Sequence, residues 1–240
     1  QLKGCDENGN REESNLQHDR GEKDVLNVHS FSLMQFLSSD MKTREYKTAV
    51  QRLFHLAKSQ TYYGGGYPDG MGLGCTPLNE AIMCALQQVP AFQAKHGVQI
   101  VNTVFLTDGD GHSMGARPGW SDQKTIVHDP KTRKDYNVTD ETNTYLQILQ
   151  ERTGTNLIGI RLTSCKNINR YQYRYFADQD MTAAAKSWKT HNFVAIDGHG
   201  YDKLFIVKGN LKVETEALDA LTEDASFAKI KNAFVKGSNN

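Results

Sequence analysis

The sequence lacks an excess of charge, a long apolar run and a regular set of cysteines. Lysine plus arginine and aspartate plus glutamate both number 28 among 240 residues, so the formal net charge is zero. This balance gives no general attraction to nucleic acid or to an anionic membrane surface. No apolar run approaches the roughly 20 residues that a membrane-spanning helix requires. We therefore expect a cytoplasmic protein that binds neither nucleic acid nor membrane.

The familiar cysteine and histidine motifs are missing as well. The four cysteines (Cys5, Cys75, Cys84 and Cys165) are scattered and contain no C-x-x-C pair. This spacing excludes a dense disulfide framework and favours a reduced, intracellular protein. The eight histidines include no H-E-x-x-H sequence and form no cluster with the cysteines. Zinc-dependent hydrolysis is therefore not indicated.

The glycine-rich segment 63–75, YGGGYPDGMGLGC, has neither of the two common nucleotide-binding patterns. It contains no Gly-Lys-Ser/Thr, so it is no phosphate-binding P-loop, and the G-x-G-x-x-G spacing is not met. We expect a flexible loop here and no bound nucleotide cofactor.

Composition divides the chain into three parts. Residues 1–24 are polar and charged and cannot bury apolar area, which predicts an arm or loop. Residues 25–212 contain the regular apolar patterns of a folded α/β domain. Residues 213–240 show a weak amphipathic pattern and are expected to form a helical or disordered tail.

Within the central part, helical and strand-like patterns alternate. Helices are expected at four places: 43–59 (begun by Asp40 or Thr43), 77–88 (begun by Thr76, ended by Pro90 and Gly97), 140–154 (begun by Asp140 or Thr142, ended by Gly154) and a stretch within 173–188. Strands are expected at 100–106 (within the stretch 98–110), 156–162, 192–196 and 203–207, with a surface hairpin near 125–138. The last two strands are either a hairpin or neighbours in the sheet. The alternation predicts an α/β fold: a Rossmann-like, doubly wound, mostly parallel sheet with helices on both faces.

The stretch Val98–Asp110, VQIVNTVFLTDGD, is the one around which the rest is organised. Six of the seven residues from Ile100 to Leu106 are apolar or β-branched, as in a strand that is buried on both faces. Asp108 follows directly, and the adjacent Gly109 allows the backbone to turn. Ligands of open α/β sheets bind outside the carboxyl ends of the strands, so this turn is the first place to expect chemistry.

A right-handed crossover brings a second residue to the same edge. The helix after Thr76 starts at the carboxyl edge of the sheet, and the next strand runs back to that edge and ends before Asp108. Both side chains offer hard oxygen ligands, which suit Mg²⁺. The alternative is that Thr76 is only a helix cap and Asp108 only a turn residue.

The pair also resembles a known family in its sequence context. Gly74-Cys75-Thr76-Pro77-Leu78 and Val104-Phe105-Leu106-Thr107-Asp108-Gly109 resemble the second and third motifs of a von Willebrand factor A (VWA) domain. The resemblance extends from about Phe31 to Val207, and it is greatest to phage-encoded proteins described as similar to the cobaltochelatase CobT subunit. For a phage-encoded protein, the cytoplasm would be that of the host cell.

This resemblance implies a metal-ion-dependent adhesion site and a binding role without catalysis. Thr76 would ligate Mg²⁺ (or Mn²⁺) directly or through water, and Asp108 would accept hydrogen bonds from metal-bound waters. Asp110 is an accessory candidate. An acidic side chain of a protein partner, in the chelatase-like branch often a AAA+ ATPase, would complete the coordination.

The first motif of the family, D-x-S-x-S, does not occur in these 240 residues. In the family it supplies the principal serine ligands and an acidic residue. We expect either that it lies upstream of Gln1, so that the VWA-like domain is truncated at its N-terminal side, or that the site is degenerate. With two oxygens and one negative charge, Mg²⁺ binding by this chain is expected to be weak.

Two other functions compete with this interpretation. Gly111-His112-Ser113-Met114-Gly115 is a G-x-S-x-G sequence, which is typical of the nucleophile elbow of α/β-hydrolases. The elbow needs a strand running directly into it and a helix leaving it, whereas four residues separate Thr107 from His112 and a Pro-Gly pair follows. A triad would also need a later acid and a histidine, for which the candidates are Asp178, Asp197, His191 and His199. The remaining alternative is a structural α/β domain whose metal site has decayed.

Overall fold

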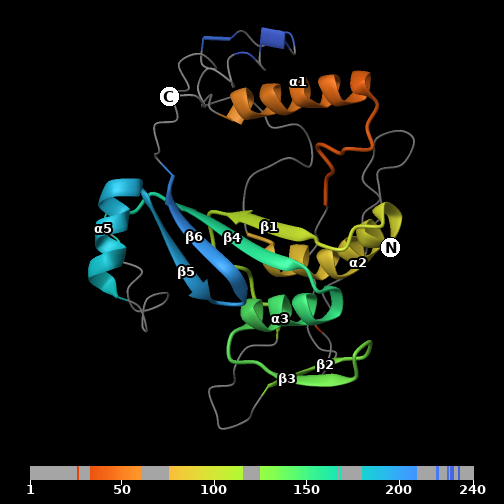
Figure 1. Ribbon diagram of the computed structural model, residues 1–240, viewed down its shortest axis with the longest axis vertical. Coiled ribbons are helices and arrows are strands. Elements are labelled where there is room, and N and C mark those ends of the chain that lie inside the picture. Colours follow the sequence, from red (N-terminus) through yellow and green to blue (C-terminus); the bar gives the residue numbers. More distant parts are fainter. Residues whose placement is uncertain are drawn as a thin grey trace. The chain divides into compact units, whose positions relative to one another are not determined.

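The computed structural model describes residues 26, 33–60, 76–115, 125–166, 168 and 180–209, and six residues between 220 and 232 (Figure 1). The chain divides into two compact units, each described by itself: Gln1–Ser32 with Cys75–Asn210, and Leu33–Gly74 with Leu211–Asn240. The expected arm at 1–24, the glycine-rich loop at 63–75 and the boundary near 213 lie outside the described residues. No helix in the described part is long and apolar enough to cross a membrane.

Helix α1 (Thr43–Gln60) belongs to the second unit and confirms the helix predicted at 43–59. The helix begins at Thr43 itself, so Thr43 lies inside it and Lys42 stands at the position of the cap residue. Lys42 precedes the helix, and its backbone N–H donates to the Glu45 carboxylate at 2.9 Å. A glutamate three residues after the cap position satisfies this donor as in a capping box, which makes a capping hydroxyl unnecessary.

The other unit is built on a four-stranded sheet of mostly parallel strands (Figure 1). Its strands are β1 (Asn102–Thr107), β4 (Asn156–Thr163), β6 (Tyr201–Lys208) and β5 (Phe193–Gly198), in that order across the sheet. β1, β4 and β6 are parallel, and β5 is antiparallel to β6. The α/β class is therefore confirmed, and the last two predicted strands form a hairpin with His199 and Gly200 in its turn.

Helices α3 (Glu141–Thr153) and α5 (Met181–His191) begin at aspartate caps. The Asp140 carboxylate accepts a hydrogen bond from the Asn143 N–H at 2.9 Å, and α3 ends at Gly154 in the left-handed conformation, as predicted. The Asp180 carboxylate accepts from the N–H groups of Thr182 and Ala183. α5 begins inside the predicted stretch 173–188 and extends beyond its end to His191, and residues 173–179 lie outside the described residues.

Helix α2 (Leu78–His96) corrects two predictions about its ends. It continues through Pro90 and ends only at Gly97, which has φ +62°. Beyond Pro90, the Gln93 side chain donates to the Thr153 carbonyl of α3 at 3.0 Å, which ties the last turns of α2 to α3. At the other end the cap position is Pro77, so Thr76 is not the cap.

The sheet is buried on one face only. Phe105, Gly159, Leu204 and Ile196 are neighbours in register across the four strands, and all are buried. The next row, Leu106, Ile160, Phe205 and Ala195, points to the opposite face because successive residues alternate in direction, and none of these is buried. The expectation that β1 is buried on both faces is wrong, since Val104 is 52% and Leu106 66% exposed.

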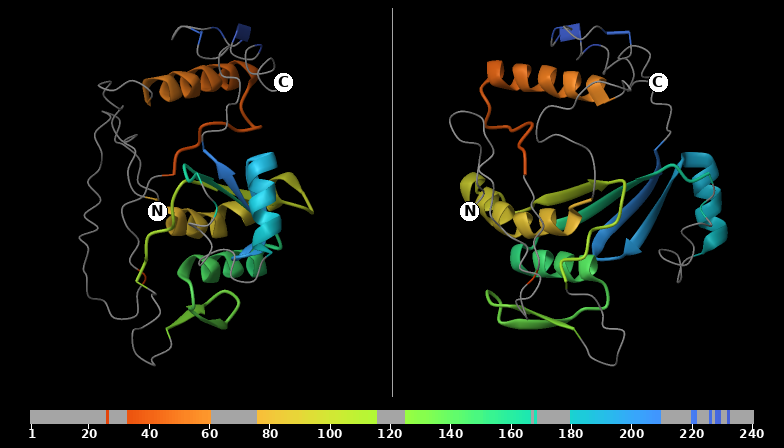
Figure 2. Two further views of the ribbon diagram at one scale, coloured as in Figure 1. Left: turned by 90° about the vertical axis from the view of Figure 1, so that its left-hand side faces the viewer. Right: turned by 180° about the vertical axis from the view of Figure 1, so that it is seen from behind.

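All three described helices of this unit pack on the buried face (Figure 2). α2 and α3 pack on Phe105 and Leu157 through Ile82, Leu86, Leu146 and Leu149. α5 packs on Val194, Ile196, Leu204 and Ile206 through Ala184 and Trp188. Helices on both faces were expected, and the described part of this unit has them on one.

The hairpin of β2 (Ile126–Asp129) and β3 (Lys134–Asn137) forms a separate two-stranded sheet, as predicted. Asp129 joins it to α3: its buried carboxylate accepts from the Arg152 guanidinium, the Thr132 hydroxyl and the Lys131 N–H. The Arg152 hydrogen bonds hold the pKa of Asp129 far below its ordinary value. The hairpin therefore depends on a charge pair that is largely removed from water.

We predict that Asp129→Asn lowers the free energy of unfolding by about 3 kcal/mol at pH 7, because Arg152 keeps its charge without a partner. The stabilisation that goes with a lowered folded-state pKa is present above the ordinary aspartate pKa. It is lost as the pH falls through the folded-state pKa. The difference between wild type and variant should thus persist at pH 4 and shrink only in stronger acid. Urea unfolding at several pH values measures it.

Lys134→Ala is the matched control, because Lys134 of the same hairpin pairs with Glu151 of α3 but is itself 59% exposed. Its effect should be much smaller than that of Asp129→Asn. Equal effects of the two substitutions would contradict the assignment of Asp129 as the anchor of the hairpin.

Candidate functional site

The turn after β1 is shaped by a threonine hydroxyl. The Thr107 Oγ1 atom accepts a hydrogen bond from the Gly109 N–H at 3.1 Å and donates to the Gly109 carbonyl at 2.8 Å. Asp108 stands at the tip of this turn and is exposed. The strand thus ends at the carboxyl edge with an acidic side chain directed away from the core.

Thr76 lies against the same turn. A Cβ atom added at Gly109 would come within 2.4 Å of the Thr76 Oγ1 atom, so only glycine fits there. The structure therefore brings Thr76 to the turn that carries Asp108. Since Pro77 occupies the cap position and no side chain caps α2, the Thr76 hydroxyl is not used in capping.

The segment after the turn is fixed to the starts of α2 and α3. The His112 N–H donates to the Thr76 carbonyl and the Thr76 N–H donates to His112 Nε2, both at 3.3 Å. The Asn79 side chain donates to the His112 carbonyl at 2.6 Å and accepts from the Thr142 hydroxyl at 2.8 Å. Through these hydrogen bonds His112 positions the loop.

Asp108 and Asp110 differ in their surroundings. The Asp110 carboxylate pairs with the Arg161 guanidinium of β4. Asp108 makes no side-chain hydrogen bond or ion pair in the described part of the chain. Of the two candidate acids, Asp108 is therefore the one whose oxygens are accessible to a ligand, and Asp110 binds the loop to the sheet.

Ser113 is not arranged as a nucleophile. Its Oγ atom accepts a hydrogen bond from the Gly115 N–H at 3.2 Å, which is a local turn contact. Within the described residues, no histidine or carboxylate is hydrogen-bonded to Ser113, and 111–115 has no helical residue. Of the proposed triad partners, Asp197 pairs with Lys203, and Asp178 lies outside the described residues.

Glu80 is a buried acid that the sequence patterns did not single out. It is 1% exposed, and neither carboxylate oxygen has a hydrogen-bond partner among the residues that the structure describes. A glutamate in the third helical position usually accepts from the N–H of the cap residue, but the cap here is Pro77, which has none. Glutamate at that position after a proline cap is the signal that would have identified it.

A second buried acid, Glu141, lies at the start of α3. Its Oε1 atom accepts from the Met114 N–H at 3.1 Å and from the Tyr145 hydroxyl at 3.4 Å. Burial raises the pKa of Tyr145, and the charges of Glu141 and Glu80 raise it further. Both acids thus act on one buried hydroxyl, although they come from the ends of two different helices.

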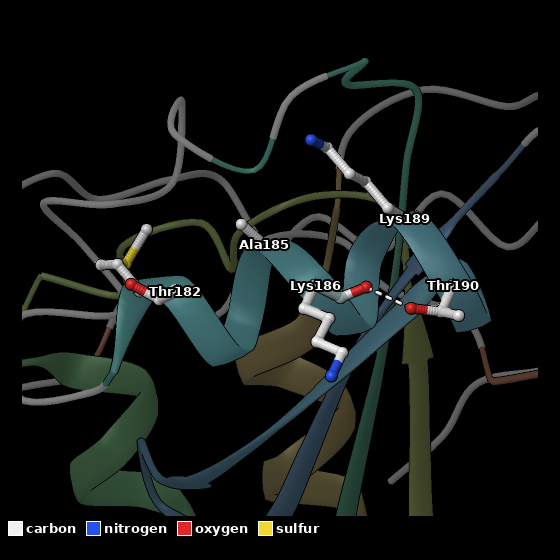
Figure 3. A pocket seen from close by; sticks show the side chains of 6 residues that line it. Thr182, Ala185, Lys186, Lys189 and Thr190 are labelled. Atoms are coloured by element: carbon white, nitrogen blue, oxygen red, sulfur yellow. Dashed lines mark hydrogen bonds between the residues drawn. The ribbon is translucent and has the colours of Figure 1, made fainter.

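Other parts of the described chain contain weaker candidates for a binding site. No group of three or more histidine, cysteine, aspartate or glutamate residues is placed to hold a metal ion within these ranges. A shallow hollow beside α5 is lined by Met181, Ala185, Lys186 and Lys189 and contains no carboxylate (Figure 3). The oxygens at the end of β1 remain the better candidate site.

Comparison with protein-family models, with curated proteins and with solved structures gives no match to this chain. The VWA-like interpretation therefore stays a prediction that depends on its two sequence motifs.

We predict that Gly109→Ala lowers the free energy of unfolding by about 1–3 kcal/mol, since the new methyl group displaces Thr76 or the turn. Gly209→Ala is the matched control, because a Cβ there meets its nearest atom at 3.6 Å, an ordinary contact. Chemical denaturation measures both. A Gly109→Ala variant as stable as wild type would show that the Thr76 contact is not tight.

We also predict opposite signs for two glutamine substitutions. Glu80→Gln should stabilise the fold by about 1 kcal/mol or more, because it removes a buried carboxylate that has no hydrogen bond. Glu141→Gln should destabilise it, because Glu141 accepts from Met114 and Tyr145. Thermal unfolding of both variants tests this. Destabilisation by Glu80→Gln would mean that this carboxylate binds something that stabilises the protein.

Proposed function

We propose that this chain binds a protein partner through a divalent cation, Mg²⁺ or Mn²⁺, at the carboxyl edge of its sheet. The observation that carries the proposal is the position of Thr76 against the Asp108–Gly109 turn, with the threonine hydroxyl unused as a cap and the aspartate exposed. Both side chains provide hard oxygen ligands of the kind that Mg²⁺ prefers.

The two residues would have different roles. Thr76 would ligate the cation directly or through water, and Asp108 would accept hydrogen bonds from the waters of the cation and offset part of its charge. When bound, the cation would supply a positive charge for an acidic side chain of the partner. Asp110 is engaged by Arg161, so its role would be to hold the loop beside the cation.

The donor set supports a site that is incomplete without the partner. Mg²⁺ keeps several waters and accepts few protein ligands, so a threonine hydroxyl and one carboxylate suffice to locate it but bind it weakly. A partner carboxylate would then raise the affinity. A Rossmann-like VWA domain with a AAA+ ATPase as partner is the form of this proposal that the two sequence motifs favour.

The proposal is tested by thermal unfolding of the whole chain with increasing Mg²⁺ or Mn²⁺. We expect the melting temperature to rise with metal concentration in wild type, because binding to the folded state stabilises it. Thr76→Ala and Asp108→Ala should abolish the shift. Asp197→Ala, an exposed acid on β5, and Thr190→Ala, on α5, are the matched controls and should retain it.

Two outcomes would contradict this function. No metal-dependent shift in wild type would favour a structural domain with a decayed site. Labelling by a fluorophosphonate probe that is lost in Ser113→Ala would favour the hydrolase instead.

A further inference from the structure

The buried Asn79 side chain connects the loop after β1 to the first turn of α3. Its Nδ2 atom donates to the His112 carbonyl at 2.6 Å, and its Oδ1 atom accepts from the Thr142 hydroxyl at 2.8 Å. A carbonyl can only accept, so the NH₂ group of the amide has to face His112 and the amide oxygen faces Thr142. The Thr142 hydroxyl thus holds the amide in the orientation in which it binds the loop.

The backbone of the loop lies directly on this pair of side chains. A Cβ atom added at Gly111 would come within 2.7 Å of the Asn79 Oδ1 atom and 3.0 Å of the Thr142 Oγ1 atom. Gly109 approaches the Thr76 Oγ1 atom in the same way, at 2.4 Å from its added Cβ. The turn after β1 therefore rests on two supports, Thr76 before α2 and the Asn79–Thr142 pair between α2 and α3.

These supports bear on Thr76 and Asp108, the two residues of the proposed cation site. The His112 N–H donates to the Thr76 carbonyl at 3.3 Å, so the loop that begins at Asp108 returns to Thr76. A site with two protein side chains gains affinity when its oxygens are held in place before the cation binds, because ordering them on binding costs free energy. The side chains that hold this loop are therefore expected to affect the affinity of the site.

We propose that Asn79 and Thr142 are positioning residues of the cation site, so that the first turn of α3 regulates its affinity. This inference rests on the proposed cation binding. Neither residue touches the cation: Thr142 orients Asn79, and Asn79 holds the loop that follows Asp108. Because coupling between two places in a protein is reciprocal, a bound cation also stabilises the first turn of α3.

Two substitutions of Thr142 separate the hydroxyl from the shape of the side chain. Thr142→Val keeps the shape but leaves the Asn79 Oδ1 atom without its donor, whereas Thr142→Ser keeps the hydroxyl. Mn²⁺ binding to the full chain is measured by electron paramagnetic resonance, which detects the free ion. We expect Thr142→Val to raise the dissociation constant about 5-fold or more, and Thr142→Ser to leave it within about 2-fold of wild type.

Thr144→Val is the matched control in the same turn of α3. The Thr144 hydroxyl donates to the Asp140 carbonyl at 2.8 Å, a hydrogen bond within the start of the helix. Its loss should lower the stability of the fold but leave the Mn²⁺ dissociation constant unchanged. Hydrogen exchange of the metal-free chain gives a second measurement: the amides of 109–112 should exchange faster in Thr142→Val than in wild type or Thr144→Val.

The outcomes distinguish this inference from the proposed function. If wild type and Thr142→Val bind Mn²⁺ equally well, the positioning role is wrong and the proposed function stands. Equal weakening by Thr142→Val and Thr144→Val would also overturn the positioning role, since general loosening of α3 would then be the cause. Unchanged exchange of the loop amides in Thr142→Val would overturn it without any metal. If wild type binds no Mn²⁺, the proposed function fails and this inference fails with it.

Discussion

The position of the carboxyl edge depends on how the loop after β1 is held between two helix starts. His112 exchanges hydrogen bonds with Thr76, Asn79 binds the His112 carbonyl, and Glu141 accepts the Met114 N–H. The Met114 side chain is fully buried, so the loop is fixed by packing as well as by polar contacts. Because α2 precedes β1 and α3 follows it, these bonds join three consecutive parts of the chain at one place. The turn with Asp108 lies against this arrangement, because Gly109 approaches Thr76 closely.

This arrangement also accounts for the buried acids around it. The N-terminal ends of helices carry partial positive charge from unpaired backbone N–H groups, which favours glutamates in the first turns of α2 and α3. Glu141 uses this position to hold Met114. Glu80 lies in the same favourable field of its helix, but the cap residue Pro77 has no N–H to donate to it. The burial of Glu80 therefore lowers the stability of the fold unless another group forms a hydrogen bond with it. Buried acids without such a partner are typical of functional sites.

Helix ends and turns could be predicted from the sequence where a local signal decides them. Asp140 and Gly154 bound α3 as expected, since an aspartate cap and a left-handed glycine act within one turn of the helix. Pro90 was misleading because α2 continues through it to His96, where tertiary contacts such as the one from Gln93 to Thr153 are made far away in the sequence. The apolar pattern of β1 predicted a strand but could not show which face is covered, because coverage depends on segments far away in the sequence. The proximity of Thr76 to the Asp108–Gly109 turn could be predicted because both flank elements that meet at one edge of the sheet. The burial of Glu80 could be read only from its place after a proline cap, a signal that the apolar pattern of the helix does not contain.

The two aspartates of the turn have different roles, and this limits the negative charge that the carboxyl edge alone can offer to a cation. The Arg161 side chain comes from the inner face of β4 and neutralises Asp110, so the loop gains an anchor at the expense of one ligand. Asp108 is then the remaining acid of the turn, with a charge half that of a divalent cation. A cation bound there would keep a net positive charge and would attract a further carboxylate. In the proposed site that carboxylate would come from the partner. Weak metal binding by the chain alone and a strong dependence on an acidic partner therefore belong to the same proposal.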